Sequence, residues 1–345
     1  MAIATRPTAP VKPHGPTLPL RLGTRGSPLA LIQTRDFLAR VARFCPVLRQ
    51  PLYGDQPVFE EHVIRTTGDA TQAAGTRLAD IGGKGLFSKE IHEALTDGRI
   101  DFAVHSLKDL ETELPAGVVL ACTLRREDPR DALILGPGCN PSDAQGGDET
   151  APVDPYACLP SGAVIGTASI RRQAQLLHAR PDLTTATLRG NVQSRLDKVA
   201  SGVCAASLLA YAGLRRLGMA DRASVVLDTE VMVPAVCQGI VGVTVRAADS
   251  ALRDLLAAIE DPEARAVASA ERALLAALDG SCRTPIGGYA HLLPNGELHI
   301  SGLVARPDGS FLLRRRLHGQ VADAARIGAE LGASLRADSP RDIFA

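Results

Sequence analysis

One short pattern occurs twice in this chain: an apolar run, a Gly-Thr turn and then a serine that can cap a helix. The first copy spans residues 22–27, and the second spans residues 165–169 with one residue fewer. Around both copies, apolar runs alternate with segments of helical spacing, which is typical of a mainly parallel sheet covered by helices. The pattern therefore predicts an α/β fold with two similar lobes that face each other.

Each copy of the pattern leads into the predicted N-terminus of a helix. Ser27 precedes Pro28, and Ser169 precedes Arg171 and Arg172. Serine is a favoured N-cap, and the free N–H groups and the dipole at such a helix end attract anions. Two such ends beside arginines predict a cleft that binds an anionic ligand.

The middle of the chain is basic, although Lys and Arg balance Asp and Glu over the whole sequence. A solvated helix face explains Arg180 and Arg215 well. It explains Arg171 and Arg172 poorly, because side chains at strand-to-helix turns line the cleft of an open α/β sheet. Arginine binds carboxylates with a planar pair of donors, so we expect the cleft to hold carboxylates.

Polar side chains follow the apolar strand predicted at residues 100–105. Ser106, Lys108 and Asp109 come directly after it, and the carboxyl end of a strand is where the site of an α/β sheet forms. A carboxylate there can stabilise a positive nitrogen or move a proton. On this segment alone, a helix N-cap is an equally good interpretation of Asp109.

Cys282 lies in a turn of small residues after a helix predicted at residues 268–278. A lone cysteine is usually a small buried hydrophobe, so the turn is weak support by itself. Together with the arginines and the repeated turns, it suggests a thiol that anchors a polyanionic group.

The composition argues against several other classes of protein. The net charge is zero and 3% of the residues are aromatic, which disfavours nucleic-acid and anionic-membrane partners. The long uncharged runs are too short and too rich in small residues or proline to span a bilayer. The seven cysteines include no C-x-x-C pair, which favours a reduced cytoplasmic protein. The histidines show no metal-ligand spacing.

At 345 residues, the chain is too long for one core, and two or three domains are expected. Residues 1–19 are rich in proline and lack the apolar segment of a signal peptide, so they are expected to form a disordered tail. Residues 140–160 break the alternation and are expected to form an exposed insertion.

Eight motifs in one order give the chain a clear resemblance to hydroxymethylbilane synthases, also called porphobilinogen deaminases. The motifs are residues 23–31, 82–90, 104–109, 126–132, 170–176, 188–192, 212–218 and 282–287. The resemblance implies two lobes like those of periplasmic binding proteins plus a smaller C-terminal α+β domain, with two chain crossings between the lobes. It implies a first lobe at 20–124 and 240–256, a second at 131–233 and a third domain at 262–345.

The resemblance also implies a transferase of porphyrin and heme biosynthesis. In that family, four porphobilinogen molecules condense head to tail with loss of ammonia, giving the linear tetrapyrrole hydroxymethylbilane. The growing chain stays on a dipyrromethane cofactor that a thioether joins to the cysteine matching Cys282. Each pyrrole carries an acetate and a propionate, and the resemblance implies that the arginines bind these carboxylates. The expected partner is porphobilinogen, and a cytoplasmic monomer without metal is expected.

The motif match, together with positions at strand-to-helix turns, assigns the site residue by residue. Asp109 is the expected catalytic residue. The expected cofactor-binding residues are Cys282, Lys108, Arg171, Arg172, Ser106, Thr167, Ser169 and Gln238. The expected substrate-binding residues are Arg25, Ser27, Arg189, Arg195, Arg216, Lys84, Phe87 and Gln33. Residues 73–85, which contain Gly-Gly-Lys-Gly, are expected to form a mobile lid.

The chain departs from the family pattern at a few positions. Leu107 replaces a common Met, Glu111 a proline, Cys237 a glycine and Asp80 a lysine. Asp80 removes one expected cation from the lid.

A second class of function fits the lobes alone: a two-lobed anion-binding module, either a receptor or the effector domain of a regulator. Such a module needs neither a third domain nor Cys282. It would also be expected to carry a signal peptide or a helix-turn-helix, and the sequence shows neither.

Overall fold

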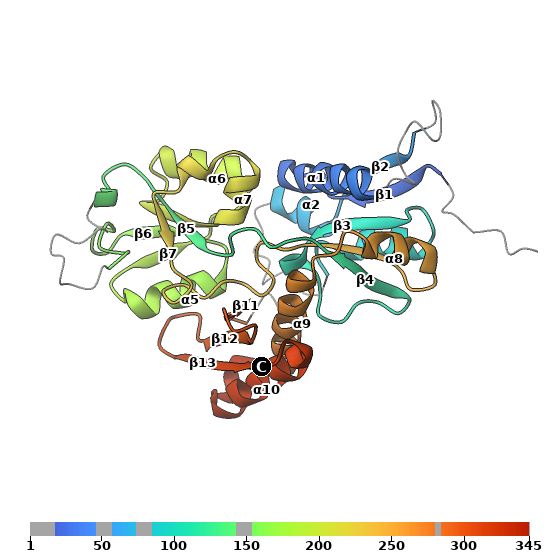
Figure 1. Ribbon diagram of the computed structural model, residues 1–345. Helices are drawn as coiled ribbons and strands as arrows, with labels where there is room; N and C mark the ends of the chain where they lie inside the picture. The colour runs from blue at the N-terminus through green and yellow to red at the C-terminus, as the bar shows by residue number, and fades with distance from the viewer. Residues whose placement is uncertain (1–17, 46–56, 74–84, 143–153, 280–283, 345) are drawn as a thin grey trace, which may run out of the picture.

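The computed structural model describes residues 18–45, 57–73, 85–142, 154–279 and 284–344. The predictions that concern the N-terminal tail up to residue 17, most of the lid, Lys84, Asp80 and Cys282 lie outside these ranges. Figure 1 shows three parts: one lobe mainly in blue and cyan, a second in green and yellow, and a C-terminal part in red below them.

The first lobe is built on a five-stranded sheet in the order β2-β1-β3-β10-β4. β1 pairs in parallel with β2 and β3, whereas β10 is antiparallel to β3 and β4. The strands are β1 (Leu20–Thr24), β2 (Phe59–Val63), β3 (Phe102–Ser106), β4 (Val118–Thr123) and β10 (Val241–Arg246). The helices are α1 (Pro28–Phe44), α2 (Thr67–Ala73), α4 (Lys89–Thr96) and α8 (Ser250–Ala257).

The second lobe repeats this plan in a sheet of order β7-β6-β8-β5-β9. β6 pairs in parallel with β7 and β8, and β5 is antiparallel to β8 and β9. The strands are β5 (Asp131–Leu135), β6 (Val164–Gly166), β7 (Thr184–Ala186), β8 (Ala206–Ala210) and β9 (Val225–Leu227). The helices are α5 (Ile170–Ala179), α6 (Val192–Ala200) and α7 (Tyr211–Arg216).

The two sheets are less parallel than the sequence pattern predicts. β5 and β10 are the strands that break the parallel order. Each of them is reached by a crossing from the other lobe, through residues 124–130 and 228–240 respectively. The strands around each repeated turn are parallel as predicted. The strand that enters from the other lobe is antiparallel to its neighbours.

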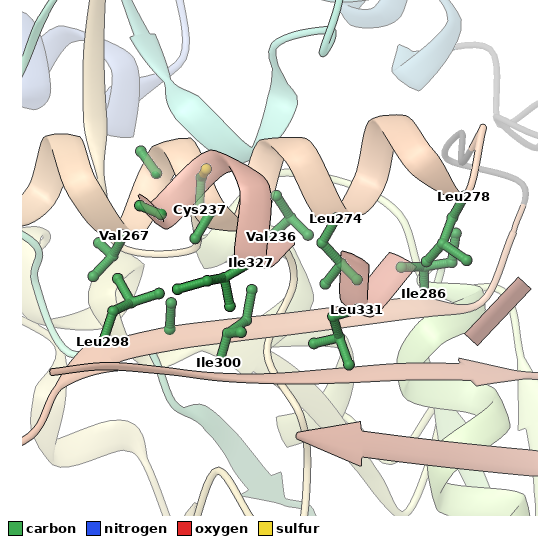
Figure 2. Close-up of a cluster of buried hydrophobic side chains, with 14 of the residues drawn as sticks. Val236, Cys237, Val267, Leu274, Leu278, Ile286, Leu298, Ile300, Ile327 and Leu331 are labelled. Carbon is green, nitrogen blue, oxygen red and sulfur yellow. The ribbon is translucent and has the colours of Figure 1, made fainter. Parts of the chain in front are cut away.

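The C-terminal domain is an antiparallel sheet packed against two helices. Its strands are β11 (Ile286–Leu292), β12 (Leu298–Ala305) and β13 (Leu312–Gly319), and its helices are α9 (Pro262–Ala277) and α10 (Ala324–Asp338). Figure 2 shows its core, where Leu274, Leu298, Ile327 and Leu331 meet. The sulfur of Cys237, from the second crossing, lies in the same cluster and ties the domain to the lobes.

The two serines of the repeated pattern are the N-caps that the sequence predicts. The hydroxyl oxygen of Ser27 accepts a hydrogen bond from the Ala30 backbone N–H at 3.3 Å, and that of Ser169 accepts one from the Arg172 N–H at 3.5 Å. These caps fix the first turns of α1 and α5.

The stretch at 140–160 is not wholly exposed, contrary to expectation. In its described part, Tyr156, Cys158 and Leu159 are buried in the core of the second lobe. Their largely apolar side chains account for this burial. The prediction of an exposed insertion rested on the high content of Gly, Pro and Asp elsewhere in the stretch. The architecture of two lobes and a C-terminal α+β domain is as predicted, while the exact domain bounds stay a prediction.

Candidate functional site

A cavity of about 400 Å³ opens between the two lobes and the C-terminal domain. Its walls come from the turn after β1, the end of β3, the start of α5, the second crossing and the start of β11. The sequence-predicted residues that line it are Arg25, Ser27, Gln33, Phe87, Ser106, Lys108, Asp109, Ser169, Arg171, Arg172, Arg189, Arg195 and Gln238. Segments far apart in the sequence therefore meet at one site.

Two predicted residues do not line this cavity. Thr167 is buried in the turn after β6, where its hydroxyl accepts a hydrogen bond from the Ser169 N–H at 3.1 Å. Arg216 lies at the end of α7 and donates from Nη2 to the carbonyl of Gly239 at 2.8 Å. Thr167 therefore shapes the turn, and Arg216 holds the second crossing. Lys84 and Cys282 lie outside the described residues.

Asp109 ends a single 3₁₀ turn, Leu107–Asp109, directly after β3. It is not the N-cap of a helix in the described structure, so that interpretation of the segment is wrong. Its side chain is 36% exposed, and its Oδ2 lies 3.7 Å from Nη1 of Arg25. The carboxylate is therefore presented to the cavity at the carboxyl end of a buried strand.

Arg25 is held in place from two sides. Its Nη2 is 2.5 Å from Oδ1 of Asp69, and its guanidinium lies 4.1 Å from the centroid of the Phe87 ring. Burial by itself would raise the pKa of Asp69, but hydrogen bonds from Arg25 and Thr66 lower it below its ordinary value. Asp69 stays charged and keeps Arg25 oriented toward the cavity.

Lys108 also faces the cavity, with Nζ 3.4 Å from Oε1 of Gln238. The Lys108 side chain is exposed to the cavity, yet the protein around it desolvates the ammonium group. This desolvation and the charges of Arg172 and Arg171 outweigh the charges of Asp109 and Asp131, and together they lower the pKa of Lys108 to about 8. Its ammonium group is thus charged at neutral pH and close to losing its proton.

Arg171 and Arg172 share one buried carboxylate that the sequence analysis did not assign to the site. Asp131 has no exposed surface, and its two oxygens each lie 2.8 Å from one of the guanidinium groups. Burial would raise the pKa of Asp131, but the charges of Arg171 and Arg172 outweigh it and hold the pKa well below its ordinary value.

A signal for Asp131 was present in the sequence. It begins the run Asp-Ala-Leu-Ile-Leu, which is otherwise apolar. An acid that enters a buried strand must be paired, because an isolated buried charge is very unfavourable.

Two further arginines enlarge the cationic wall. Arg189 is 7% exposed, and its Nη1 is buried without a hydrogen-bond partner among the described residues. Arg195 donates from Nε to the carbonyl of Gly190, and burial, with the charges of Arg172 and Arg189, lowers its pKa to about 10. Buried polar atoms are nearly always paired, so this guanidinium nitrogen of Arg189 is suited to bind an anionic ligand.

Polar neighbours complete the floor of the cavity. The hydroxyl of Ser106 donates to Oε1 of Gln33 at 3.0 Å. His105 also lines the cavity, and its Nε2 is 2.9 Å from the hydroxyl of Thr244. Burial lowers the pKa of His105 to about 3, so this imidazole is neutral and brings no charge to the site.

Three of the described cysteines are poor nucleophiles. Cys45, Cys122 and Cys237 are buried, and burial raises the pKa of each thiol. A thiolate is the reactive form, so these groups are inert. Within the described ranges, no three His, Cys, Asp or Glu side chains are arranged to hold a metal ion.

The charge balance of the cavity wall is one-sided. Six cations line it, namely Arg25, Lys108, Arg171, Arg172, Arg189 and Arg195. Asp109 is the acid among the described lining residues. Such a wall fits a ligand with several carboxylates.

Two family models match the chain. The model for the porphobilinogen deaminase dipyrromethane cofactor binding domain matches residues 20–254, and the model for the porphobilinogen deaminase C-terminal domain matches residues 266–337. None of the described helices is both long and apolar enough to cross a membrane.

Curated relatives match over nearly the whole chain. A porphobilinogen deaminase of Sorangium cellulosum is 46% identical over 92% of this chain and 98% of its own. One of Nitrobacter hamburgensis is 44% identical over 94% of each chain, and a chloroplastic one of Pisum sativum is 44% identical over 92% of this chain and 80% of its own. Both the family models and these relatives show that this chain belongs to the porphobilinogen deaminase family.

Proposed function

We propose that this protein condenses four porphobilinogen molecules head to tail, with loss of ammonia, to give hydroxymethylbilane. The observation that carries the proposal is the cavity wall, whose described residues include six cations and one carboxylate, that of Asp109. Porphobilinogen brings one acetate and one propionate, which match the cations. Its reaction develops positive charge on the pyrrole nitrogen, which matches the carboxylate.

The residues present also fit a dipyrromethane cofactor held by a thioether to Cys282. The pair of Arg171 and Arg172, which share the carboxylate of Asp131, supplies donors for its carboxylates. Thr284, two residues after Cys282 in the sequence, lines the cavity. When bound, this group supplies a covalent primer on which the product chain is built.

The side chains have distinct roles in this proposal. Lys108, Arg171 and Arg172 hold the carboxylates of the cofactor rings, with Ser106 and Ser169 as hydrogen-bonding neighbours. A second set of residues binds the carboxylates of incoming porphobilinogen. This second set is Arg25, Ser27, Arg189 and Arg195, with Gln33 and Phe87 beside them.

Asp109 does the electrostatic work of the reaction. Its exposed carboxylate stabilises positive charge on a pyrrole nitrogen as that charge develops. Stabilising the transition state more than the substrate in this way accelerates the step, whereas binding both equally well does not. It also accepts and returns protons at the departing amine and at the ring carbon. Arg25, 3.7 Å away, is positioned to bind a substrate carboxylate beside the reacting nitrogen.

Arg216 and Thr167 take supporting roles rather than the ligand-binding roles expected from the motifs, because neither lines the cavity. We further propose that the enzyme acts in the cytoplasm as a monomer, with porphobilinogen as its partner and without nucleic acid or membrane.

A binding module without catalysis is the less favoured function. It would use the two lobes and the arginines, but it gives no role to the C-terminal domain, whose family model matches residues 266–337. It also leaves Asp109 without a purpose, because a carboxylate in a site for anions weakens binding.

Turnover tests the proposal directly. Purified protein supplied with porphobilinogen should release four ammonia molecules for each hydroxymethylbilane formed, and a Cys282→Ser variant should be folded and inactive. Tight binding of porphobilinogen without release of ammonia would favour the binding module instead.

A further inference from the structure

The carboxylate of Asp131 accepts hydrogen bonds from two arginines of the second lobe and from Gln238 of the second crossing. Asp131 is the first residue of β5, directly after the crossing at 124–130, and it has no exposed surface. Oδ2 accepts from Nη2 of Arg171 at 2.8 Å, and Oδ1 accepts from Nη2 and Nε of Arg172 at 2.8 and 3.2 Å. One anion therefore sets the direction of two adjacent guanidinium groups.

The two arginines need such an anion. They are 5% and 6% exposed, and two neighbouring buried cations repel each other strongly in a medium of low dielectric constant. Backbone carbonyls hold their other ends, at Val233 for Arg171 and Leu208 for Arg172. A guanidinium carries five N–H donors, so both side chains keep donors for a ligand carboxylate in the cavity.

Gln238 links this group to the opposite lobe. It lies in the second crossing and is fully buried. Its Nε2 donates to Oδ1 of Asp131 at 2.8 Å and to the carbonyl of Pro129, in the first crossing, at 2.7 Å. Its Oε1 accepts from Nζ of Lys108 at 3.4 Å, next to Asp109 in the first lobe.

The surrounding backbone keeps Gln238 in place. The Glu127 N–H donates to the carbonyl of Gly239 at 3.0 Å, and Nε of Arg126 donates to the carbonyl of Gln238 at 2.8 Å. Gly239 has φ of +91°, and a Cβ there would lie 2.3 Å from the Glu127 carbonyl oxygen. Only glycine allows the two crossings to approach this closely.

We infer that Asp131 and Gln238 are positioning residues, through which Lys108 of the first lobe and the arginine pair of the second lobe are held at a fixed separation. The inference rests on the proposed function, because it gives these three cations carboxylates of one ligand to bind. Neither Asp131 nor Gln238 needs to touch that ligand. Their effect is to orient the groups that do, and this differs from the cofactor contact expected for Gln238 from the family resemblance.

The test uses the full-length enzyme and two variants that should fold. Gln238→Met is nearly isosteric and removes the hydrogen bonds of the side-chain amide to Asp131, Pro129 and Lys108. Asp131→Glu keeps the counter-charge but displaces it by one methylene, whereas Asp131→Asn would leave two buried guanidinium groups unbalanced. Gln173→Met, which loses a hydrogen bond to the carbonyl of Pro307 outside the cavity, is the control.

Intact mass gives the fraction of protein that carries covalent pyrroles, and steady-state kinetics on that fraction gives kcat and KM. Each positioning variant should show lower occupancy and a kcat reduced by roughly 10–100-fold, as for other residues that orient ligand-binding groups. KM should change little. The double variant should lose no more than the more damaged single variant, because the two residues act through one network. Thermal unfolding checks that each variant is folded.

Near-normal occupancy and kcat in folded Gln238→Met would overturn the inference, and so would losses that multiply in the double variant. An equal loss in Gln173→Met would overturn it as well. If the unmodified protein carries no pyrroles and does not consume porphobilinogen, the proposed function fails and this inference with it. If the unmodified protein is active and the variants are unaffected, the inference is overturned and the proposed function stands.

Discussion

Nη1 of Arg25 lies 3.7 Å from Oδ2 of Asp109, although one residue follows β1 and the other follows β3. Because β1 and β3 are parallel neighbours, their carboxyl ends meet at one edge of the sheet. The contact joins a cation that can hold a substrate carboxylate to the anion that can stabilise a pyrrole cation. A cation suited to a carboxylate of porphobilinogen and an anion suited to its pyrrole nitrogen thus lie side by side in the cavity.

Replacement of Asp109 by Asn should leave the fold intact and remove most of the turnover. The amide keeps the size and hydrogen bonding of the side chain but not its charge. The loss in kcat should be about 10²–10⁴-fold, as for other groups that stabilise developing charge or transfer protons. Steady-state kinetics measures it, with circular dichroism as the check on folding. A variant with near-normal kcat would place the catalytic charge elsewhere.

Replacement of Arg189 by Gln should weaken substrate binding more than it weakens stability. Its Nη1 has no partner among the described residues, so no described hydrogen bond of that atom is lost. One charged hydrogen bond is worth about 1.5–3 kcal/mol, or roughly a 10–150-fold rise in KM. Arg326→Gln is the control, because that exposed side chain pairs with Asp323 and Glu330 on the surface. Equal KM values in the two variants would count against a substrate role for Arg189.

The value of kcat/KM for porphobilinogen should fall as the pH rises through about 8, because Lys108 then loses its hold on a carboxylate of the cofactor. Burial lowers the pKa of Lys108 to about 8, so its ammonium is charged below that pH and neutral above it. The charged form holds a carboxylate, and deprotonation removes that attraction. A pH profile of kcat/KM should therefore have an alkaline limb that moves upward in Lys108→Arg, because arginine stays protonated. An unchanged limb in this variant would assign the titration to another group.

At position 237, a glycine variant should be more stable than an alanine variant, which reverses the usual order of stability. Cys237 has φ of +61° and is 1% exposed. A left-handed conformation costs a non-glycine residue about 1–2 kcal/mol, so Cys237→Gly should unfold at a higher urea concentration than Cys237→Ala. In ordinary helix or strand positions glycine is the less stable by roughly 0.5–1 kcal/mol. Greater stability of the alanine variant would show that the backbone relaxes without strain.

The sequence predicted those parts of the fold that depend on local patterns. Ser27 and Ser169 are N-caps because a short hydroxyl side chain after a Gly-Thr turn reaches the free N–H groups of the next helix, whatever the rest of the chain does. The position of Asp109 after a buried strand followed from the apolar run before it. Neither feature needs knowledge of distant residues.

Other features depend on residues far apart in the chain and could not be read from local pattern. The antiparallel direction of β5 and β10 follows from the two crossings, which leave no periodic signal. Asp131 and Arg171 are 40 residues apart, and only the folded second lobe brings them together. Arg216 matched a family motif, yet in the fold it donates to the carbonyl of Gly239 in the second crossing and does not line the cavity.

Intact mass spectrometry of the purified protein, followed by mapping of the modified peptide, tests the central claim most directly. The account predicts a covalent addition of two porphobilinogen-derived pyrrole units on Cys282, and no addition in Cys282→Ser. An unmodified mass in an active protein would contradict the account, and so would the same addition on Cys139, Cys237 or any other cysteine.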